Sequence, residues 1–198
     1  EAPTDITGSA ITDLVLASVS RVENGNLFVY ALGSTGKLYK IQPNSSTNAN
    51  VDSVVGIGSV AAGGISFNKG ASMQLFGYSS VVGASSNSVL GRIFIGGDGQ
   101  VNKINVDFGG DALVGTIANY TQNRYRPLAQ FIGKLIFGNG NTIGVIDSTG
   151  TVTSPLNSSS VYSQLNPGFP PETYVTDIDV NPNGTYVAIS SSGIQTEG

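Results

Sequence analysis

The sequence contains no cysteine, no histidine and no tryptophan. Without cysteine the chain can form neither disulfides nor thiolate metal sites, so its stability has to come from packing and strand pairing. Without histidine it lacks the commonest general base and the commonest transition-metal ligand, and Ser-His-Asp and Cys-His hydrolases are excluded. We therefore expect a protein that uses no cofactor and no metal and that is not an enzyme.

Charged residues are scarce as well, at 11% of the 198 residues, compared with roughly a quarter in a typical soluble domain. The nine Lys and Arg residues form no cluster and the net charge is −4. This argues against a nucleic-acid partner, because phosphate binding needs a basic face. No apolar run is long enough for a transmembrane helix, so no membrane insertion is expected. A surface of hydroxyl and amide groups is typical of secreted, cell-surface and virion proteins, and we expect an extracellular or virion location.

Short apolar runs rich in Val, Ile, Phe and Tyr recur along the chain, and helix periodicity is nearly absent. Each run is four to seven residues long, which is the usual length of a β-strand. With 39% hydrophobic residues, these runs can fill a core. They are NLFVYAL (26–32), KLYKI (37–41), SMQLFGY (72–78), RIFIG (92–96), VNKINV (101–106), KLIFG (134–138), TIGVID (142–147) and TYVAIS (185–190).

Tight turns are predicted between these runs, because Asn-Gly and Asp-Gly supply the positive φ of a two-residue hairpin loop at little cost. The carboxylates of Asp98 and Asp147 are expected to accept backbone N–H bonds at their turns, which is the usual role of such residues. The predicted turn pairs are Asn24 and Gly25, Asp98 and Gly99, Asn139 and Gly140, and Asn183 and Gly184.

The strands and turns recur in units of roughly 40 to 50 residues, a period typical of β-propellers with four strands in each blade. Aligned on their central strands, the units have these strands beginning near Leu27, Met73, Leu135 and Tyr186. We predict one all-β domain over residues 1–198, a β-propeller of about four four-stranded antiparallel blades or part of a larger propeller. A β-sandwich is the alternative.

The last unit is short, and two explanations are open. Either the first eleven residues complete the last blade, or the chain is part of a larger propeller; the absence of an initial Met and of a signal peptide suggests a processed form or a fragment.

The stretch KLIFGNGNTIGVIDSTGTV (134–152) resembles the blade consensus of YVTN-type β-propeller repeats. Together with FPPETYVTDIDV (169–180), it is similar to propeller-like segments of bacteriophage virion and tail proteins. The resemblance covers residues 126–192 and is diffuse over the first 110. It implies blade geometry more directly than it implies a function.

Two groups of polar residues are candidate binding sites. Arg124, Tyr125 and Arg126 place two guanidinium groups beside a ring, and Arg is well suited to a carboxylate, a phosphate or an acidic sugar. The alternative is that one Arg forms an ion pair with a carboxylate of a neighbouring blade while the Tyr125 ring packs within the fold. Asp177 and Asp179 share one face of a strand, which would line a channel or meet solvent. Their spacing would allow glycoside hydrolysis, which uses two carboxyl groups, one of them with a raised pKa. Nothing in the sequence indicates a burial that would raise the pKa of either.

The segment 153–172 is the longest irregular stretch, and its Tyr162 and Phe169 could contact a protein or a glycan. The alternative is a connector packed over the blades. Composition, resemblance and missing catalytic residue types together predict a non-enzymatic structural or adhesion module of an extracellular assembly, most simply a phage virion or tail component. Its partners would be other protein subunits and a host-surface glycan. The alternative is a secreted carbohydrate-binding or carbohydrate-active propeller.

Overall fold

The protein is all-β, as predicted. A computed structural model describes residues 11, 13–23, 25–45, 48–56, 66–76, 91–110, 112–114, 117, 125–147, 151–153, 169–170 and 173–193. Within these residues there are strands and turns but no helix, and hence no helix that could cross a membrane.

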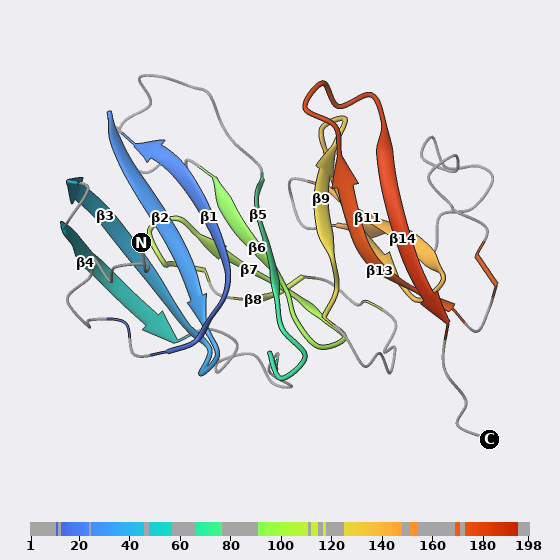
Figure 1. Cartoon of the computed structure of the whole chain (residues 1–198), viewed down its shortest axis with the longest axis horizontal. Helices are drawn as coiled ribbons and strands as arrows, with labels where there is room; N and C mark the ends of the chain where they lie inside the picture. The colour runs from blue at the N-terminus through green and yellow to red at the C-terminus, as the bar shows by residue number, and fades with distance from the viewer. Residues whose placement is uncertain are drawn as a thin grey trace, which may run out of the picture.

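The strands form four separate antiparallel sheets, and within each sheet the strands are ordered as in the chain (Figure 1). Sheet 1 contains β1 (Val15–Glu23), β2 (Asn26–Gly33), β3 (Lys37–Ser45) and β4 (Asn48–Gly56). Sheet 2 contains β5 (Ser72–Phe76), β6 (Arg92–Gly96), β7 (Val101–Asn105) and β8 (Ala112–Leu113). Sheet 3 contains β9 (Leu128–Phe131), β10 (Lys134–Asn139), β11 (Thr142–Ile146) and β12 (Val152–Thr153), and sheet 4 contains β13 (Thr173–Val180) and β14 (Val187–Gly193).

Successive sheets lie next to one another through their first strands. The strand β1 contacts β5, β5 contacts β9, and β9 contacts β13. In Figure 1 sheet 1 lies at one side of the molecule, sheet 2 in the middle, and sheets 3 and 4 at the other side. None of the described sheets closes on itself.

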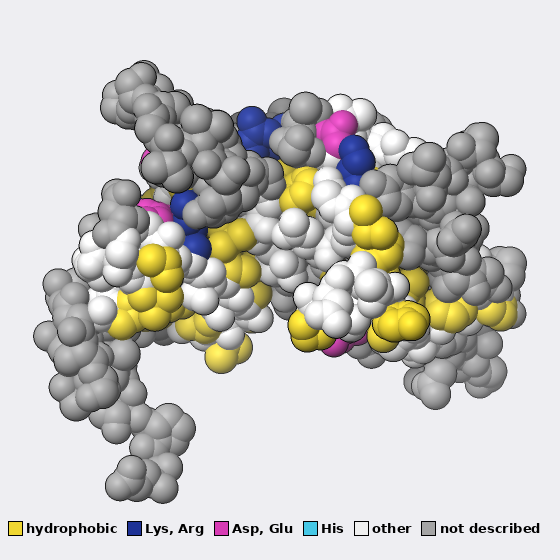
Figure 2. Space-filling model, turned by 90° about the horizontal axis from the view of Figure 1, so that it is seen from above, with side chains coloured by type: hydrophobic (Ala, Val, Ile, Leu, Met, Phe, Trp, Pro, Cys, Tyr) yellow, Lys and Arg dark blue, Asp and Glu magenta, His cyan; other side chains and the backbone are white. Residues whose placement is uncertain are grey.

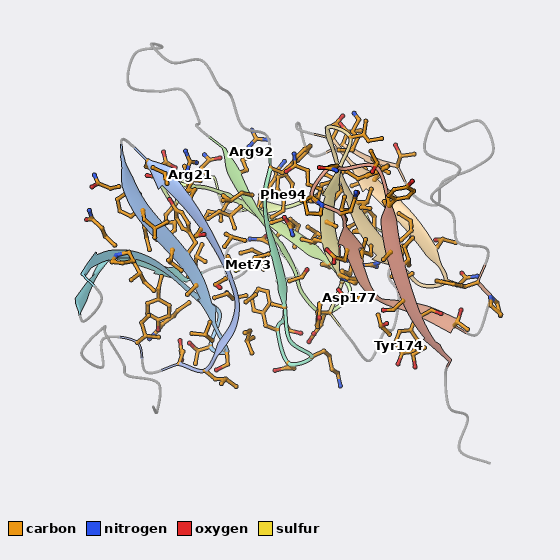
Figure 3. The ribbon with its side chains drawn as sticks, turned by 45° about the horizontal axis from the view of Figure 1, so that its top comes forward. Arg21, Met73, Arg92, Phe94, Tyr174 and Asp177 are labelled. Atoms are coloured by element: carbon orange, nitrogen blue, oxygen red, sulfur yellow. The ribbon has the colours of Figure 1, made fainter. Side chains whose placement is uncertain are left out.

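Apolar side chains fill the spaces between the sheets. Successive side chains of a strand point to opposite faces, so the continuous apolar runs of sheets 2 and 3 place apolar side chains on both faces. The second strand of sheet 2, β6, illustrates this. Ile93 and Ile95 pack towards sheet 1, while Phe94 between them packs towards sheet 3. Figure 3 labels Phe94 on β6 and Met73 on β5, which belong to these two different clusters. A third cluster, which includes Ile136 and Val175, joins sheets 3 and 4.

The alignment of the repeat units was wrong for one of the four. Met73 lies in β5, the first strand of sheet 2, and not in the second strand as Leu27 does in sheet 1. The strand equivalent to β2 is β6, which begins at Arg92. The unit near Tyr186 was aligned correctly, because β14, the second strand of sheet 4, begins at the next residue, Val187. Tyr186 itself lies in the loop before β14, with 77% of its surface exposed.

Two of the predicted turns are confirmed. Glu23 pairs with Asn26, which leaves residues 24 and 25 as the hairpin loop, and Gly25 has a φ of 80°; Asn24 itself lies outside the described residues. The Gly97 N–H donates to the Gln100 carbonyl at 3.0 Å, which leaves Asp98 and Gly99 as the loop.

The other two turns differ from the prediction. Asn139 is the last residue of β10 and pairs with Thr142, so the loop consists of Gly140 and Asn141. Only Gly140 has a positive φ, 63°, which is the type II′ pattern with glycine at the first loop position. Asn183 and Gly184 belong to a longer loop that is organised by Asn181, whose Oδ1 accepts the Thr185 and Tyr186 N–H groups at 2.8 and 2.7 Å.

The hairpin between β9 and β10 contains a strained residue that the sequence did not reveal. Its two loop residues, Ile132 and Gly133, both have positive φ values, 42° and 68°. Such a loop favours Asn-Gly, whereas a β-branched side chain crowds the backbone in the left-handed region. Ile132 is also 65% exposed, so packing does not offset this strain.

We therefore expect Ile132→Asn to raise the free energy of unfolding by about 1 kcal/mol, measured by urea denaturation. Val22→Asn is the matched control, because Val22 is similarly exposed but lies in a strand, where a β-branched residue is favoured. The control is expected to lower stability. Equal losses in both variants would show that Ile132 is not strained.

Candidate functional site

Arg126 lies at the junction of sheets 2 and 3 and is fully buried. Its Nε donates to the Gly99 carbonyl at 2.8 Å, on the β6–β7 turn of sheet 2. Its Nη1 donates to the Gly138 carbonyl and to Asn139 Oδ1 on β10, both at 2.9 Å. The guanidinium carbon lies 5.7 Å from the centroid of the Phe137 ring. The side chain thus bonds within the fold, where the predicted ligand would not reach it.

The backbone around Arg126 joins the same two sheets. The Arg126 N–H donates to the Gly97 carbonyl at 3.1 Å, and Ser72 Oγ on β5 donates to the Arg126 carbonyl at 2.7 Å. Tyr125 forms an isolated bridge with Asp98 and its ring lies close to Gly70. Arg124, the third residue of the predicted group, lies outside the described residues. The structure therefore places Tyr125 and Arg126 in a sheet junction.

Asp177 and Asp179 are both exposed on β13, on the face that is turned away from sheet 3. Each Oδ1 accepts the N–H of the following residue, Ile178 at 2.9 Å and Val180 at 2.8 Å. The two carboxylates therefore share one face, as predicted, and meet solvent. A role in binding a glycan stays a prediction.

Of the two aromatic candidates in the segment 153–172, only Phe169 is described; Tyr162 lies outside the described residues. Phe169 is half-buried and packs against the cluster between sheets 3 and 4. Its carbonyl accepts a bond from Asn141 Nδ2 at 2.8 Å. The described contacts of Phe169 are those of a connector packed on the sheets.

The turn aspartates accept bonds as predicted, but Asp98 does so from another segment. Asp147 Oδ1 accepts the Thr151 N–H at 3.0 Å across the connection from β11 to β12. Asp98 accepts from Ser66 Oγ at 2.6 Å and from the Lys69 N–H at 3.0 Å, so it fixes the segment that precedes β5.

A second polar cluster, which the sequence analysis missed, lies on the face of sheet 1 that packs against sheet 2. Glu23 is its centre and accepts a bond from the Tyr30 hydroxyl at 2.5 Å. Lys40 Nζ lies 3.0 Å from Glu23 Oε2, and Arg21 Nε lies 3.3 Å from Oε1. The Tyr30 hydroxyl also donates to the Val106 carbonyl at 3.2 Å, next to β7 of sheet 2. Both oxygens of Glu23 are thus held by partners within the fold.

The turn prediction contained the information needed to find this cluster. A two-residue loop at residues 24 and 25 sets Arg21 opposite Phe28 and Val19 opposite Tyr30. Strand alternation then places Arg21, Glu23 and Tyr30 on one face. Figure 3 labels Arg21 on β1 and Arg92 on β6, towards the same end of sheets 1 and 2.

A third group surrounds Asp13, at the start of the first sheet. Its Oδ2 accepts bonds from Thr35 Oγ1 at 2.6 Å and from the Tyr39 hydroxyl at 2.8 Å. The Thr35 bond and then the Tyr39 bond lower the pKa of the Asp13 carboxyl, and the charge of Lys37 contributes in the same direction. Burial, followed by the bond to Asp13, raises the pKa of the Tyr39 hydroxyl.

These shifts predict how stability depends on pH. Because the pKa of Asp13 is lower in the folded chain, its contribution is present above about pH 4 and is lost as the pH falls through the folded value. Because the pKa of Tyr39 is raised, its contribution is present below about pH 10 and is lost as the pH rises through the folded value.

We expect Asp13→Asn to make the urea midpoint less sensitive to pH on the acidic side, since the amide still accepts bonds but does not titrate. Thr35→Val removes the larger cause of the shift, so its acid-side loss should be intermediate. An unchanged acid-side loss in Asp13→Asn would contradict this assignment.

These three groups share one arrangement, in which polar side chains bond to other parts of the fold. Within the described residues no three Asp or Glu side chains gather as a metal site would require.

No protein-family model matches the chain, and a search of curated proteins finds no similar sequence.

Proposed function

We propose that the chain is a non-enzymatic structural or adhesion module of an extracellular assembly such as a phage virion or tail, built as a propeller-like series of blades. The observation that carries the proposal is the serial junction of the sheets. Each sheet begins with a strand that contacts the first strand of the next sheet, which is the arrangement expected when blades repeat around an axis.

The buried polar residues support a structural role. Arg126 bonds from its own segment to sheet 2 and to β10, and Tyr30 bonds from sheet 1 to the chain next to β7. A fully buried guanidinium is costly unless its donors are satisfied, so it is best explained by a need for rigid sheet junctions. Rigid sheets are what a module needs in order to hold its connecting loops in fixed positions.

The hairpin tips of sheets 3 and 4 are suited to contact another subunit. Ile132 at the β9–β10 tip and Tyr186 in the β13–β14 loop are both large, apolar and exposed. Both connections lead from a first to a second strand and lie at the same end of the molecule (Figure 1). Figure 2 views this end from above and shows hydrophobic side chains in separate patches among uncharged polar groups, with few charged ones. Ile132 is aliphatic and favours a protein partner, whereas the aromatic ring of Tyr186 suits either a protein or a glycan.

The experiment is to purify extracellular particles from the source organism and to search them for this chain by mass spectrometry. We expect stoichiometric copies in the particles. If the chain were found only as free secreted protein, the proposal would be overturned. A glycan array with the purified chain tests the carbohydrate alternative; binding that is lost in the double variant Asp177→Asn, Asp179→Asn would favour that alternative.

A further inference from the structure

The dipeptide Asn-Gly occurs at residues 24–25, 139–140 and 183–184, and it is able to modify itself. The glycine backbone nitrogen attacks Cγ of the asparagine, a C–N bond forms, and the proton of that nitrogen leaves with the side-chain NH₂ as ammonia. Glycine permits this attack because it has no side chain to hinder it. Water then opens the five-membered imide at one of its two carbonyl groups. The product is aspartate or isoaspartate, and in isoaspartate the main chain runs through the former side chain.

The fold opposes this reaction at Asn139. The ring closes only if the peptide group that joins Asn139 to Gly140 rotates towards the side chain. The carbonyl of that group accepts a bond from Thr142 Oγ1 at 2.8 Å, and Asn139 Oδ1 accepts one from Arg126 Nη1 at 2.9 Å. The Gly140 carbonyl accepts the Val175 N–H at 2.8 Å. Rotation would disrupt these bonds, one of which has a charged donor and is therefore of the strongest kind.

Asn183 lacks this protection. It is exposed in the loop between β13 and β14, which Figure 1 shows at one end of the molecule. In the part of the chain that the structure describes, its side chain forms no hydrogen bond. The peptide group that joins it to Gly184 has a single described bond, from the Gly184 N–H to the Asn181 carbonyl at 2.8 Å. One bond in an exposed loop opens more readily than several bonds at the end of a paired strand, so the Gly184 nitrogen is released more often.

Asn181, in the same loop, is blocked from this reaction. It precedes Pro182, which has no backbone N–H and cannot act as the nucleophile. Its side chain is also held, because Oδ1 accepts the Thr185 and Tyr186 N–H groups at 2.8 and 2.7 Å. Deamidation through an imide is therefore confined to Asn183 in this loop.

We propose that Asn183 is a site of spontaneous deamidation in the folded protein, whereas Asn139 keeps its amide. The product places a carboxyl group in an exposed loop and adds one negative charge to the net −4 of the chain. The isoaspartate form also adds a methylene carbon to the main chain between β13 and β14, which changes the turn that the Gly184 bond to Asn181 closes. This site stands without the proposed function.

Peptide mapping by mass spectrometry during incubation in mildly alkaline buffer tests the proposal. Chymotrypsin cuts after tyrosine and phenylalanine and so places the two sites in separate peptides, 138–162 and 175–186. Deamidation adds about 1 Da, the difference between an amide and a carboxyl group. In the folded chain Asn183 should convert at least about tenfold faster than Asn139, because the bonds that hold Asn139 raise the barrier to ring closure.

Two controls make the test specific. In guanidinium chloride the bonds of the fold are absent, so the same dipeptide should convert at similar rates at both positions. Asn183→Gln should abolish the mass gain in peptide 175–186, because glutamine would have to close a larger ring. Equal rates at Asn139 and Asn183 in the folded chain would overturn the proposal. So would a rate difference that persists in guanidinium chloride, or a mass gain that persists in Asn183→Gln and therefore belongs to Asn181.

Discussion

Replacing Arg126 by Met is expected to lower the free energy of unfolding by about 3–5 kcal/mol. The substitution removes the donors to the Gly99 and Gly138 carbonyls and leaves buried acceptors without their partner. The aliphatic part of the side chain is kept, so the loss reports chiefly on the hydrogen bonds. Urea denaturation monitored by tyrosine fluorescence and far-UV circular dichroism would measure it.

Two further variants make this test specific. Lys69→Met removes a cation that is exposed and should change stability by less than about 0.5 kcal/mol. Arg126→Lys keeps a charge but not the fork of donors, so its loss should be smaller than that of Arg126→Met yet still large. A loss in Arg126→Met no greater than that in Lys69→Met would show that the buried guanidinium does not hold the junction.

The second large effect is expected at Gly96, the last residue of β6. A Cβ atom at this position would overlap the carbonyl oxygen of Arg126 and approach Ser72 Oγ at 2.8 Å. Both atoms belong to the hydrogen bond that joins β5 to the segment before β9. We expect Gly96→Ala to lower the free energy of unfolding by at least about 3 kcal/mol, because backbone has to move for the methyl group to fit.

Gly109→Ala is the matched control for Gly96→Ala. Its Cβ would lie 3.3 Å from Asp107 Oδ1, an oxygen of an exposed side chain that accepts the Gly109 N–H at 3.0 Å, so a shift of a few tenths of an ångström in that side chain makes room for the methyl group. We expect a change below about 1 kcal/mol in the control. The argument from close sheet packing would fail if the two alanine variants lost the same stability in urea.

The strands that the sequence predicted best are those with continuous apolar runs. All eight predicted runs overlap strands, among them β6 and β10, whose apolar residues are buried on both faces. The strand β1 was missed as a separate strand because serine alternates with its apolar residues. Short or half-polar strands give a weak periodic signal, and pairing with their neighbours stabilises them.

The errors in register have a similar cause. Asn-Gly and Gly-Asn both suit a tight turn, so local preference did not decide between residues 139–140 and 140–141. The choice is made by packing across β10 and β11, where Phe137 lies opposite Gly144 and its ring occupies the space that a side chain there would need. Met73 was assigned to a central strand because a long connection, and not a tight turn, separates β5 from β6.

The candidate site was the least predictable part. The Arg-Tyr-Arg segment suggested an open anion site, since a local sequence does not reveal that the acceptors of Arg126 come from Gly99 and Gly138. The cluster around Glu23 could have been derived from the turn at residues 24 and 25. Its contact with Val106 in the next sheet could not, because it depends on how two sheets pack.

The bonds of Arg126 also bear on how the molecule unfolds. An array of similar units can open one unit at a time when the coupling between neighbours is weak. Sheets 2 and 3, however, share a buried charge, and separating them would expose the donors of Arg126 from both sides. These two sheets should therefore unfold as one cooperative block, with partial opening beginning at the two-stranded sheet 4.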